Sequence, residues 1–452
     1  MRKPPEPSFP LPVRIWRGLK DPIGYLTYAE AELGDVVALR QGRSYALFHP
    51  DHIKHVLQEN AKNYEKGVKY RAALAPIMGN GLFTSEGSFW LRQRRLAQSA
   101  FQRAHVASFA DGITACLKDL LEDWTTRSSR GETIDIRRDL VLATLRMTVR
   151  NLFSTEPDMT TLAPAVVEVS EQIHFGAQFL PFHLPKWVQT PARRRFADGM
   201  RVIDAFAYRV VADRRTAAPG NRDFVSLMMD ARDEETGEGM SDRQLRDELV
   251  TMLIAGHDTV TDAAVWTMVL LAQHPEYAAQ LREEIRRVAG DGWPSVESLK
   301  ELDLLGRVIH ESLRLYPPGW VFARTALADD EIGGYRIPAG AIVAISPYVM
   351  QRSKRYWDDP LRFDPDRFLP ERSTGRPRFV YFPFGGGQRQ CIGQGLAMIE
   401  LPLLLVGILR QFEFEIDDAV SIAPSPRISL RPDRRVRARL RQPRTSQAPS
   451  RV

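Results

Sequence analysis

A single stretch constrains the fold of this 452-residue chain more tightly than any other: Phe384-Gly-Gly-Gly-Gln-Arg389-Gln-Cys391-Ile-Gly393. Its cysteine closes a glycine-rich loop and precedes an apolar segment, from Leu396 onward, that is typical of a helix. Backbone N–H groups and the helix dipole favour a thiolate at such a position. We therefore expect the Cys391 sulfur to be a metal ligand or a nucleophile. The alternative is an inert, buried cysteine after a glycine-rich turn.

Residues 255–259, Ala-Gly-His-Asp-Thr, lie inside a helical pattern that runs from a capping box at Ser241 to a stop at Pro275. A glycine inside a helix costs about 1 kcal/mol relative to alanine. Gly256 therefore needs a reason, such as the close approach of a ligand. The alternative is a bent core helix whose Thr259 hydroxyl bonds back to a carbonyl.

Three other segments place charges or aromatic residues at regular spacing. Glu311-Ser-Leu-Arg314 has opposite charges three residues apart, and Trp90 and Arg94 are separated by one helical turn. The segment Phe363-Asp-Pro-Asp-Arg367-Phe368 follows. Taken alone, Glu311 and Arg314 are more typical of an exposed salt bridge worth less than about 1 kcal/mol, and Arg94 is more typical of an ordinary surface charge.

The spacing Phe-x-x-Gly-x-Arg-x-Cys-x-Gly resembles the cysteine loop of the cytochrome P450 superfamily, the heme-thiolate monooxygenases. The upstream segments match further motifs of that family in the same order, over about 300 residues from Trp90 to Gly393. The resemblance implies the cytochrome P450 fold, mainly α with a smaller β portion, in a single catalytic domain over residues 1–452. It also implies heme b, with Cys391 as the axial iron ligand that favours O–O cleavage.

The resemblance further assigns roles to the matched residues. Phe384 would shield the sulfur, and Gly387 and Gly393 would let the backbone approach the sulfur and the porphyrin. The residues expected to bind the cofactor are Cys391, Trp90, Arg94, Arg324, Arg389, Phe384, Gly387 and Gly393.

The resemblance also implies two groups beside the cofactor. Gly256 would leave space for dioxygen, while Asp258 and Thr259 would relay protons to it. A buried charged triad would hold the cysteine loop in place, and loss of one member would leave an uncompensated charge that costs several kcal/mol. Its members are Glu311, Arg314 and Arg367.

Composition excludes several other classes of protein. The net charge of +6 comes from residues 431–452, which contain eight Arg and one Asp. The rest of the chain is nearly neutral and gives no sign of nucleic-acid binding. Alternation within 436–441 predicts a half-exposed strand there.

The chain has two cysteines, too few for a disulfide framework or a zinc cluster. Cys116 lies in an apolar helical stripe, which predicts that it packs in the core. We expect a reducing compartment.

The remaining elements are predicted from periodicity and composition. Residues 36–48 predict a hairpin, 241–273 a long buried helix, and 304–316 a shorter helix. Residues 1–20 and 443–452 are expected to be extended or frayed. The N-terminal region holds no run long enough for a signal or a membrane span, so we expect a cytoplasmic protein without a transmembrane anchor. The substrate pocket is predicted to be lined by residues 69–82, 175–182, 254–255 and 319–322.

The predicted function is insertion of one oxygen atom of O2 into a lipophilic substrate, such as a terpenoid, fatty acid, steroid or polyketide. The chain has no recognisable flavin or nicotinamide motif, so electrons would come from a separate ferredoxin or flavodoxin with its reductase. Arg92 and Arg95 are candidates for docking that partner, or are ordinary solvated arginines. Three alternatives remain: a peroxide-using or isomerising heme-thiolate enzyme, a heme-based sensor, and a cysteine-nucleophile hydrolase. The sequence leaves open the exact substrate, the regiochemistry and the oligomeric state.

Overall fold

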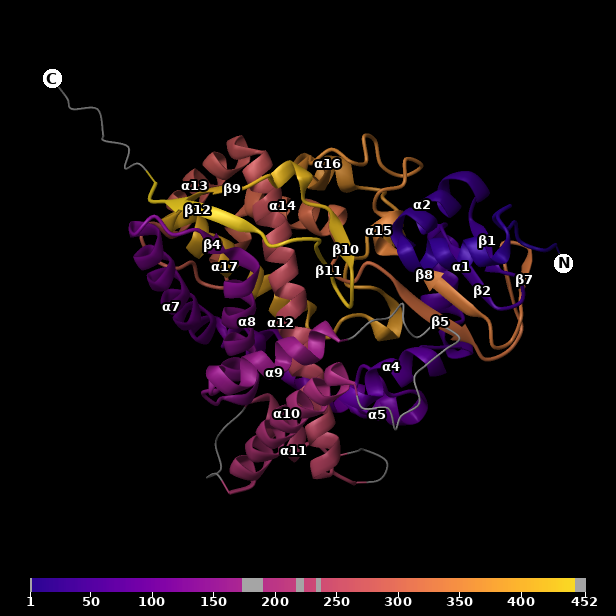
Figure 1. Ribbon diagram of the computed structural model, residues 1–452, viewed down its shortest axis with the longest axis horizontal. Helices are drawn as coiled ribbons and strands as arrows, with labels where there is room; N and C mark the ends of the chain where they lie inside the picture. Colours follow the sequence, from indigo (N-terminus) through magenta and orange to yellow (C-terminus); the bar gives the residue numbers. More distant parts are fainter. Residues whose placement is uncertain (1, 173–189, 217–222, 233–236, 444–452) are drawn as a thin grey trace.

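The computed structural model describes residues 2–172, 190–216, 223–232 and 237–443. Most helices form one large body, and the five-stranded sheet lies with the N-terminal helices on the opposite flank (Figure 1). The predicted balance, mainly α with a smaller β portion, is confirmed.

Helices and strands follow one another along the described chain with these bounds. The helices are α1 (Leu11–Lys20), α2 (Pro22–Leu33), α3 (Pro50–Lys54), α4 (Val68–Met78), α5 (Gly87–Gln98), α6 (Arg103–Ala107), α7 (Ala110–Ser129), α8 (Ile136–Phe153), α9 (Met159–Glu171), α10 (Pro191–Thr216), α11 (Phe224–Asp230), α12 (Asp242–Gln273), α13 (Pro275–Ala289), α14 (Asp303–Leu315), α15 (Pro347–Met350), α16 (Pro370–Ser373) and α17 (Gln394–Gln411). The strands are β1 (Val36–Arg40), β2 (Ser44–Leu47), β3 (Tyr64–Glu65), β4 (Ile134–Asp135), β5 (Phe322–Ala326), β6 (Asp330–Ile332), β7 (Tyr335–Ile337), β8 (Ile342–Ile345), β9 (Glu413–Ile416), β10 (Pro424–Pro426), β11 (Leu430–Pro432) and β12 (Arg437–Arg441).

Helix α12 is the central element of the body. The Ser241 side chain accepts a hydrogen bond from the Gln244 backbone, and the Gln244 side chain completes the predicted capping box. The helix continues for 32 residues, about 48 Å at 1.5 Å per residue, and ends at His274 as expected. Most of its side chains are buried. Because α8, α10, α14 and α17 all pack against it, α12 fixes the positions of the helices that carry the candidate site.

The larger sheet has the strand order β1-β2-β8-β5-β3. Strands β1 and β2 form the predicted antiparallel hairpin, with Val36 opposite Leu47. Strand β8 runs parallel to β2 and antiparallel to β5. This pairing attaches β5, which carries Arg324, to the N-terminal hairpin.

A second sheet has the order β4-β12-β9, so the C-terminal strand lies in its middle. Ala438 and Leu440 are buried while the arginines between and beside them are exposed, which confirms the predicted half-exposed strand. The Ile136 N–H donates to the Val436 carbonyl at 2.9 Å. The end of the chain is thereby joined to the first turn of α8.

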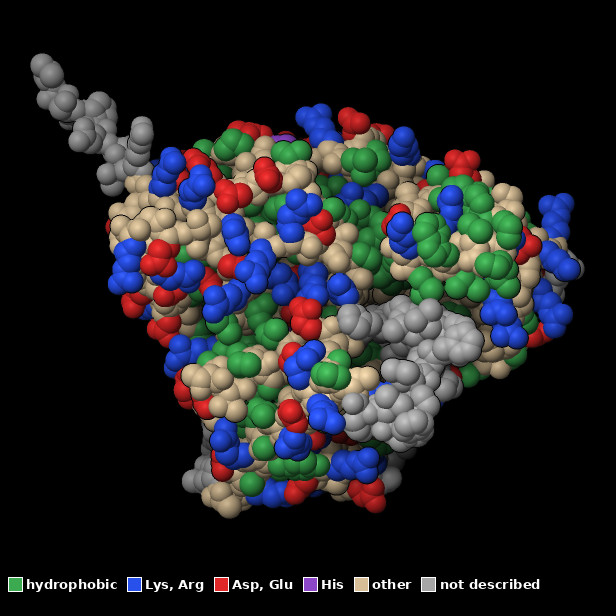
Figure 2. All heavy atoms as spheres, viewed as in Figure 1, with side chains coloured by type: hydrophobic (Ala, Val, Ile, Leu, Met, Phe, Trp, Pro, Cys, Tyr) green, Lys and Arg blue, Asp and Glu red, His purple; other side chains and the backbone are tan. Residues whose placement is uncertain are grey.

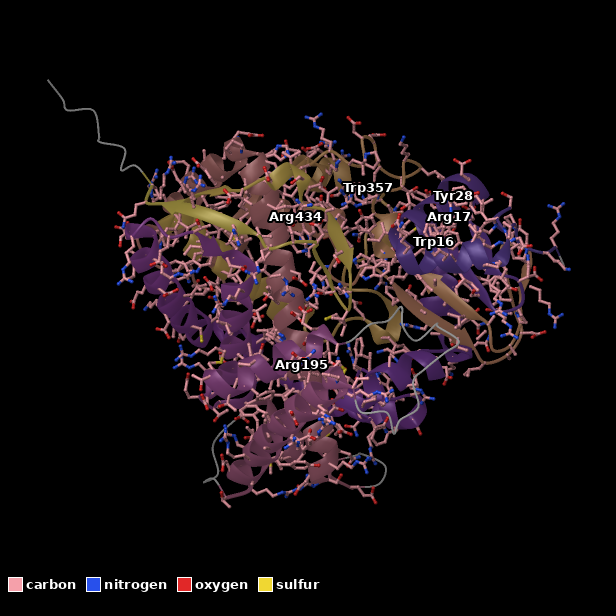
Figure 3. The ribbon with its side chains drawn as sticks, viewed as in Figure 1. Trp16, Arg17, Tyr28, Arg195, Trp357 and Arg434 are labelled. Carbon is pink, nitrogen blue, oxygen red and sulfur yellow. The ribbon has the colours of Figure 1, made fainter. Side chains whose placement is uncertain are left out.

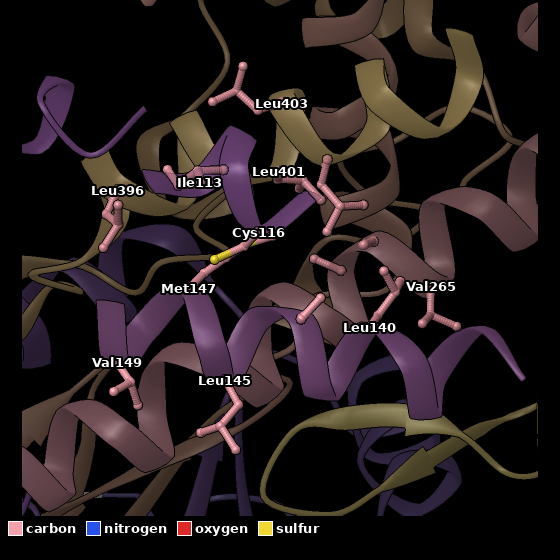
Figure 4. Packing of buried hydrophobic residues seen from close by; sticks show 14 of the residues in the cluster. Ile113, Cys116, Leu140, Leu145, Met147, Val149, Val265, Leu396, Leu401 and Leu403 are labelled. Atoms are coloured by element: carbon pink, nitrogen blue, oxygen red, sulfur yellow. The ribbon is translucent and has the colours of Figure 1, made fainter. Parts of the chain in front are cut away.

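The hydrophobic core is largest where α7, α8, α12 and α17 meet. Cys116 lies there, buried among Ile113, Met147 and Leu401 (Figure 4), so the packing role predicted for this cysteine is confirmed. Among the described residues, α17 is the one helix long and apolar enough to cross a membrane, and 67% of it is buried inside the protein. Its apolar composition thus serves the core.

The expectation for the N-terminus was wrong in part. Residues 11–20 form helix α1 and are not extended. Pro12 is tolerated in the first turn of a helix, and the apolar residues that follow it recur at helical spacing. Residues 444–452 lie outside the described part of the chain. Of the segment 443–452, which was expected to be frayed, the structure describes only Pro443.

Candidate functional site

A cavity of about 360 Å³ lies between α12, the 383–393 loop, α5 and the segment 318–324. Its walls are mostly apolar. They include residues from three of the predicted lining segments, namely Met78, Leu82, Ile254, Ala255, Gly319, Val321 and Phe322. Residues 175–182, which were also expected to line it, lie outside the described residues. The cavity is suited to an apolar guest.

The cysteine loop closes one wall of this cavity. The Cys391 N–H donates to the Phe384 carbonyl at 3.0 Å, which folds the loop back on itself. Gly387 has φ of +71°, and a Cβ there would overlap the Leu57 carbonyl oxygen, so the position requires glycine. A Cβ at Gly393 would lie 4.0 Å from the Cys391 sulfur. The expected closeness of the backbone to the sulfur thus occurs at Gly393, whereas Gly387 makes room for the helical turn His55–Glu59.

Cys391 is open to the cavity but otherwise surrounded by protein. Burial raises the pKa of its thiol, while the N–H groups of Gly393 and Gln394 and the Arg94 charge oppose that shift. The expected N–H groups are therefore present, but burial outweighs them. A free thiol of raised pKa is a poor nucleophile, whereas a coordinating metal ion would deprotonate it.

The surroundings of this sulfur limit which metal it could bind. The described residues contain no group of three or more His, Cys, Asp and Glu side chains that could hold a metal ion. As far as the described residues go, a metal at Cys391 would therefore receive its other ligands from a non-protein group. A heme iron, whose other ligands come largely from the macrocycle, meets this requirement.

Four cations meet at one side of the cavity: Lys66, Arg94, Arg324 and Arg389. Arg389 stacks over the Trp90 ring at 3.7 Å, donates to the Ser85 carbonyl at 2.9 Å and pairs with Glu86. Burial, together with the Arg324 and Arg94 charges and against the Glu86 carboxylate, lowers the pKa of Arg389 to about 10.

Lys66 belongs to the same cluster, although it is not part of the sequence motifs described above. Its Nζ donates to the Phe83 carbonyl at 2.6 Å and lies 4.0 Å from the centre of the Phe83 ring. Burial, followed by the nearby arginine charges, holds the pKa of Lys66 well below its usual value. The cluster keeps a positive excess beside the Glu86 carboxylate, so it favours an anionic group. The two carboxylates of a heme fit this charge, so the residues present suit that cofactor.

The opposite wall is formed by the middle of α12. Thr259 and Ala255 are open to the cavity, and the Thr259 hydroxyl donates to the Ala255 carbonyl at 3.0 Å. A Cβ at Gly256 would press on Thr148 of α8 at 3.2 Å. Close helix packing is therefore one reason for this glycine. Its backbone lines the cavity, as the expected role in making room for a ligand requires.

Asp258 also lines the cavity, and α8 holds its carboxylate. Arg137 donates to Asp258 at 3.1 Å and to Asp262 at 2.8 Å, and the Ser429 hydroxyl also donates to Asp262. Burial raises the pKa of Asp262 to about 6, against the lowering effect of Arg137. Local sequence patterns do not reveal Arg137, because its contact with Asp258 joins two separate helices.

The predicted charged triad is assembled within the fold. Arg314 and Glu311 are fully buried and form two hydrogen bonds of 2.6 and 2.7 Å. Arg367 lies 3.5 Å from the same Glu311 carboxylate. Arg314 also donates to the carbonyls of Gln351 and Pro360, which ties α14 to the segment that leads to the cysteine loop.

One further buried acid adjoins the cavity. Glu400 of α17 lines it, and burial raises the pKa of this carboxyl to about 8. It was not among the predicted site residues, because a glutamate in an apolar helix reveals its burial only once the helix is placed.

Comparisons with known proteins agree with this geometry. The model of the family described as Cytochrome P450 matches residues 4–436. The chain is 36% identical to cyclooctatin synthase of Streptomyces melanosporofaciens, with 91% of this chain and 89% of that protein covered. It is 32% identical to pentalenene oxygenase of Streptomyces avermitilis, with 96% of each covered. The crystal structure of the cytochrome P450DA heme domain superposes with a TM-score of 0.88 at 25% identity, covering 98% of each chain.

Proposed function

The chain belongs to the cytochrome P450 family and is a monooxygenase with a heme iron cofactor, and on this premise we propose that it inserts one oxygen atom of O2 into a terpenoid. The observation that carries the proposal is the apolar cavity with Cys391 on one wall and Asp258 and Thr259 on the opposite one. The names of two relatives, cyclooctatin synthase and pentalenene oxygenase, support a terpenoid over a fatty acid, a steroid or a polyketide.

We propose heme b as the cofactor, with Cys391 as the axial ligand. When bound, this group supplies the chemistry of dioxygen activation. Arg94, Arg324 and Arg389, with Trp90 beside them, would neutralise and orient its carboxylates, and Lys66 would add a fourth cation. Because these cations gather at one side of the cavity, they would hold the carboxylates of the cofactor on that side.

On the α12 side the protein would deliver protons. The Asp258 carboxylate, fixed by Arg137, would exchange protons with the solvent side, and the Thr259 hydroxyl would pass them into the cavity. The apolar walls would exclude water and favour a hydrocarbon substrate. Phe384 would shield the sulfur, and Glu311, Arg314 and Arg367 would hold the loop that carries it.

We propose that electrons arrive from a separate ferredoxin or flavodoxin with its reductase, and that the whole chain acts as one catalytic domain in the cytoplasm. Turnover that requires the reduced partner and fails with peroxide alone would distinguish this from a peroxide-using relative. The Asp258 and Thr259 pair supports the reductive route, because a peroxide-using enzyme needs no proton relay.

The absorption spectrum of the purified protein, oxidised and then reduced under carbon monoxide, tests the proposal. We expect a strongly red-shifted Soret band in the reduced complex, lost in Cys391→Ser and retained in the matched control Cys116→Ser. A protein that binds no heme when heme is supplied would refute it. Substrate class follows from turnover of terpene hydrocarbons against fatty acids and steroids, where preference for a fatty acid or a steroid would overturn the terpenoid assignment.

A further inference from the structure

Helix α1 presents its apolar side to solvent. Leu11 and Ile15 lie one turn apart on the same face, and Trp16 lies about 100° farther around the helix. Their exposed fractions are 40%, 42% and 56%. An amphipathic helix of a globular protein normally turns such a face toward the core, yet no residue of α1 is buried. Apart from the half-buried Leu19, the large apolar side chains of α1 therefore lie open to solvent.

Helix α1 contacts the protein on the side of Arg14 and Gly18, which are half-buried. Arg14 donates to the Phe9 carbonyl and to the Glu6 carboxylate, both at 2.6 Å. The Gly18 position lies against the Tyr25 ring of α2. These contacts fix which face of the helix points outward.

The segment before α1 anchors the helix further. The Phe9 ring lies 5.5 Å from the Tyr28 ring, and the Arg17 guanidinium lies 4.1 Å from the centre of Phe9. Figure 3 labels Tyr28 and Arg17, with Trp16 near them. Phe9 is thus held between α2 and α1. The exposed apolar face is consequently a built feature of the surface and does not arise from a loose end.

Positive charge surrounds this face. Residues 2–20 contain five Lys or Arg and one Glu, and Lys20 lies 4.7 Å from the Trp16 ring. Figure 2 shows hydrophobic side chains gathered over α1 and α2 with Lys and Arg side chains nearby. Four of the eleven large apolar side chains exposed among the described residues lie on this helix, the fourth being Val13. Exposed apolar residues including Trp, accompanied by cations, are typical of helices that lie in a membrane interface.

We propose that α1 is a peripheral docking surface for a bilayer that contains anionic lipids. Ile15 and Trp16 would enter the boundary between headgroups and acyl chains, while Arg17 and Lys20 would contact lipid phosphates. A second copy of the chain is a poorer occupant, because it would bring two like-charged helices together. A helix of ten residues also offers little area for a stable dimer.

Docking of this kind goes beyond the proposed reaction. It depends on the surface of α1 and not on the chemistry in the cavity. If the substrate is lipophilic, docking would also bring the enzyme to the phase in which such molecules accumulate.

Vesicle flotation of the full-length heme protein tests the proposal. We expect binding to vesicles of equimolar phosphatidylglycerol and phosphatidylcholine and much weaker binding to phosphatidylcholine alone. Ile15→Ser with Trp16→Ser should weaken the apparent affinity roughly tenfold or more, as loss of two inserted apolar side chains predicts. The matched control is Leu361→Ser with Val420→Ser, two residues that are 70% and 88% exposed elsewhere, and it should bind like the unaltered protein.

Two results would overturn the proposal. One is equal flotation of the Ile15 and Trp16 variant and the unaltered protein; the other is no flotation of the unaltered protein with anionic vesicles. If the latter came with a dimer in light scattering that the same variant abolishes, the occupant would be a second copy. Heme spectra and circular dichroism of each variant confirm folding, and because flotation needs no turnover, its failure is separate from failure of the proposed oxidation.

Discussion

Glu311→Gln is expected to lower the free energy of unfolding by about 3–5 kcal/mol. The change keeps the volume of the side chain and removes its charge. Arg314 is fully buried, and Arg367 is 5% exposed, so two guanidinium groups would lose the carboxylate that neutralises them. The backbone carbonyls that Arg314 also contacts solvate a cation but do not balance its charge. The predicted loss is therefore that of a broken buried ion pair.

The assay is equilibrium unfolding in guanidinium chloride, followed by circular dichroism. Glu283→Gln is the matched control, because Glu283 pairs with Arg286 at the same i, i+3 spacing but with 72% and 62% of the side chains exposed. That variant should lose less than about 0.5 kcal/mol. Replacement of both Glu311 and Arg314 by Leu and Met should recover part of the loss. A cost for Glu311→Gln below about 1 kcal/mol, or equal to that of the control, would refute the reasoning.

Three more predictions concern the loop, α17 and α8. Gly387→Ala should abolish heme incorporation, because its Cβ would overlap the Leu57 carbonyl oxygen. The control is Gly385→Ala: Gly385 has the same φ of +71° but nothing within 4 Å of an added Cβ, so this change should lower the free energy of unfolding by only about 1 kcal/mol. Equal heme content in the two variants would contradict this. Burial raises the pKa of Glu400 from an ordinary 4.5 to about 8 in the folded protein, so the folded state binds a proton that the unfolded state has released. The free energy of unfolding should therefore fall as pH rises from about 4.5 to 8, by at most about 1.4 kcal/mol per pH unit. In Glu400→Gln the free energy of unfolding should depend less on pH over that range, and an unchanged slope would refute the assignment. Arg137→Gln should lower kcat about tenfold with little change in KM. It should also shift the acid limb of the pH–rate profile upward, because Arg137 lowers the pKa of Asp262 and that carboxylate would gain a proton more readily without it. An unchanged profile would show that Arg137 does not position the relay.

Local spacing was sufficient to predict several features. The capping box, the proline stop and the uninterrupted helical periodicity located α12 to within a residue. The Glu311 and Arg314 pair could be anticipated because three residues place two side chains on one helix face. Alternation predicted β12, and two β-rich runs joined by a short turn predicted the first hairpin. Each of these signals depends only on neighbours in sequence.

Contacts between distant segments could not be read in this way. Lys66 and Arg137 acquire their roles only when a loop or a second helix approaches, and nothing near them in sequence signals the partner. Glu400 is marked by burial, which requires the packing of α17 to be known. The outward face of α1 was also unpredictable, because an amphipathic pattern defines two sides without stating which one meets the protein.

The middle position of β12 in its sheet has a consequence for how the protein is made. A chain emerges from the ribosome N-terminus first, and domains generally fold in that order. Strand β12 is the last regular element of the described chain, yet the residue just before it, Val436, bonds the first turn of α8, which carries Arg137. The helices of the body can begin to pack during translation, but the first turn of α8 gains its bond to Val436 only once the segment that leads into β12 has been synthesised. A nascent chain truncated before Val436 would therefore hold α8 and α12 without the strand that braces the start of α8.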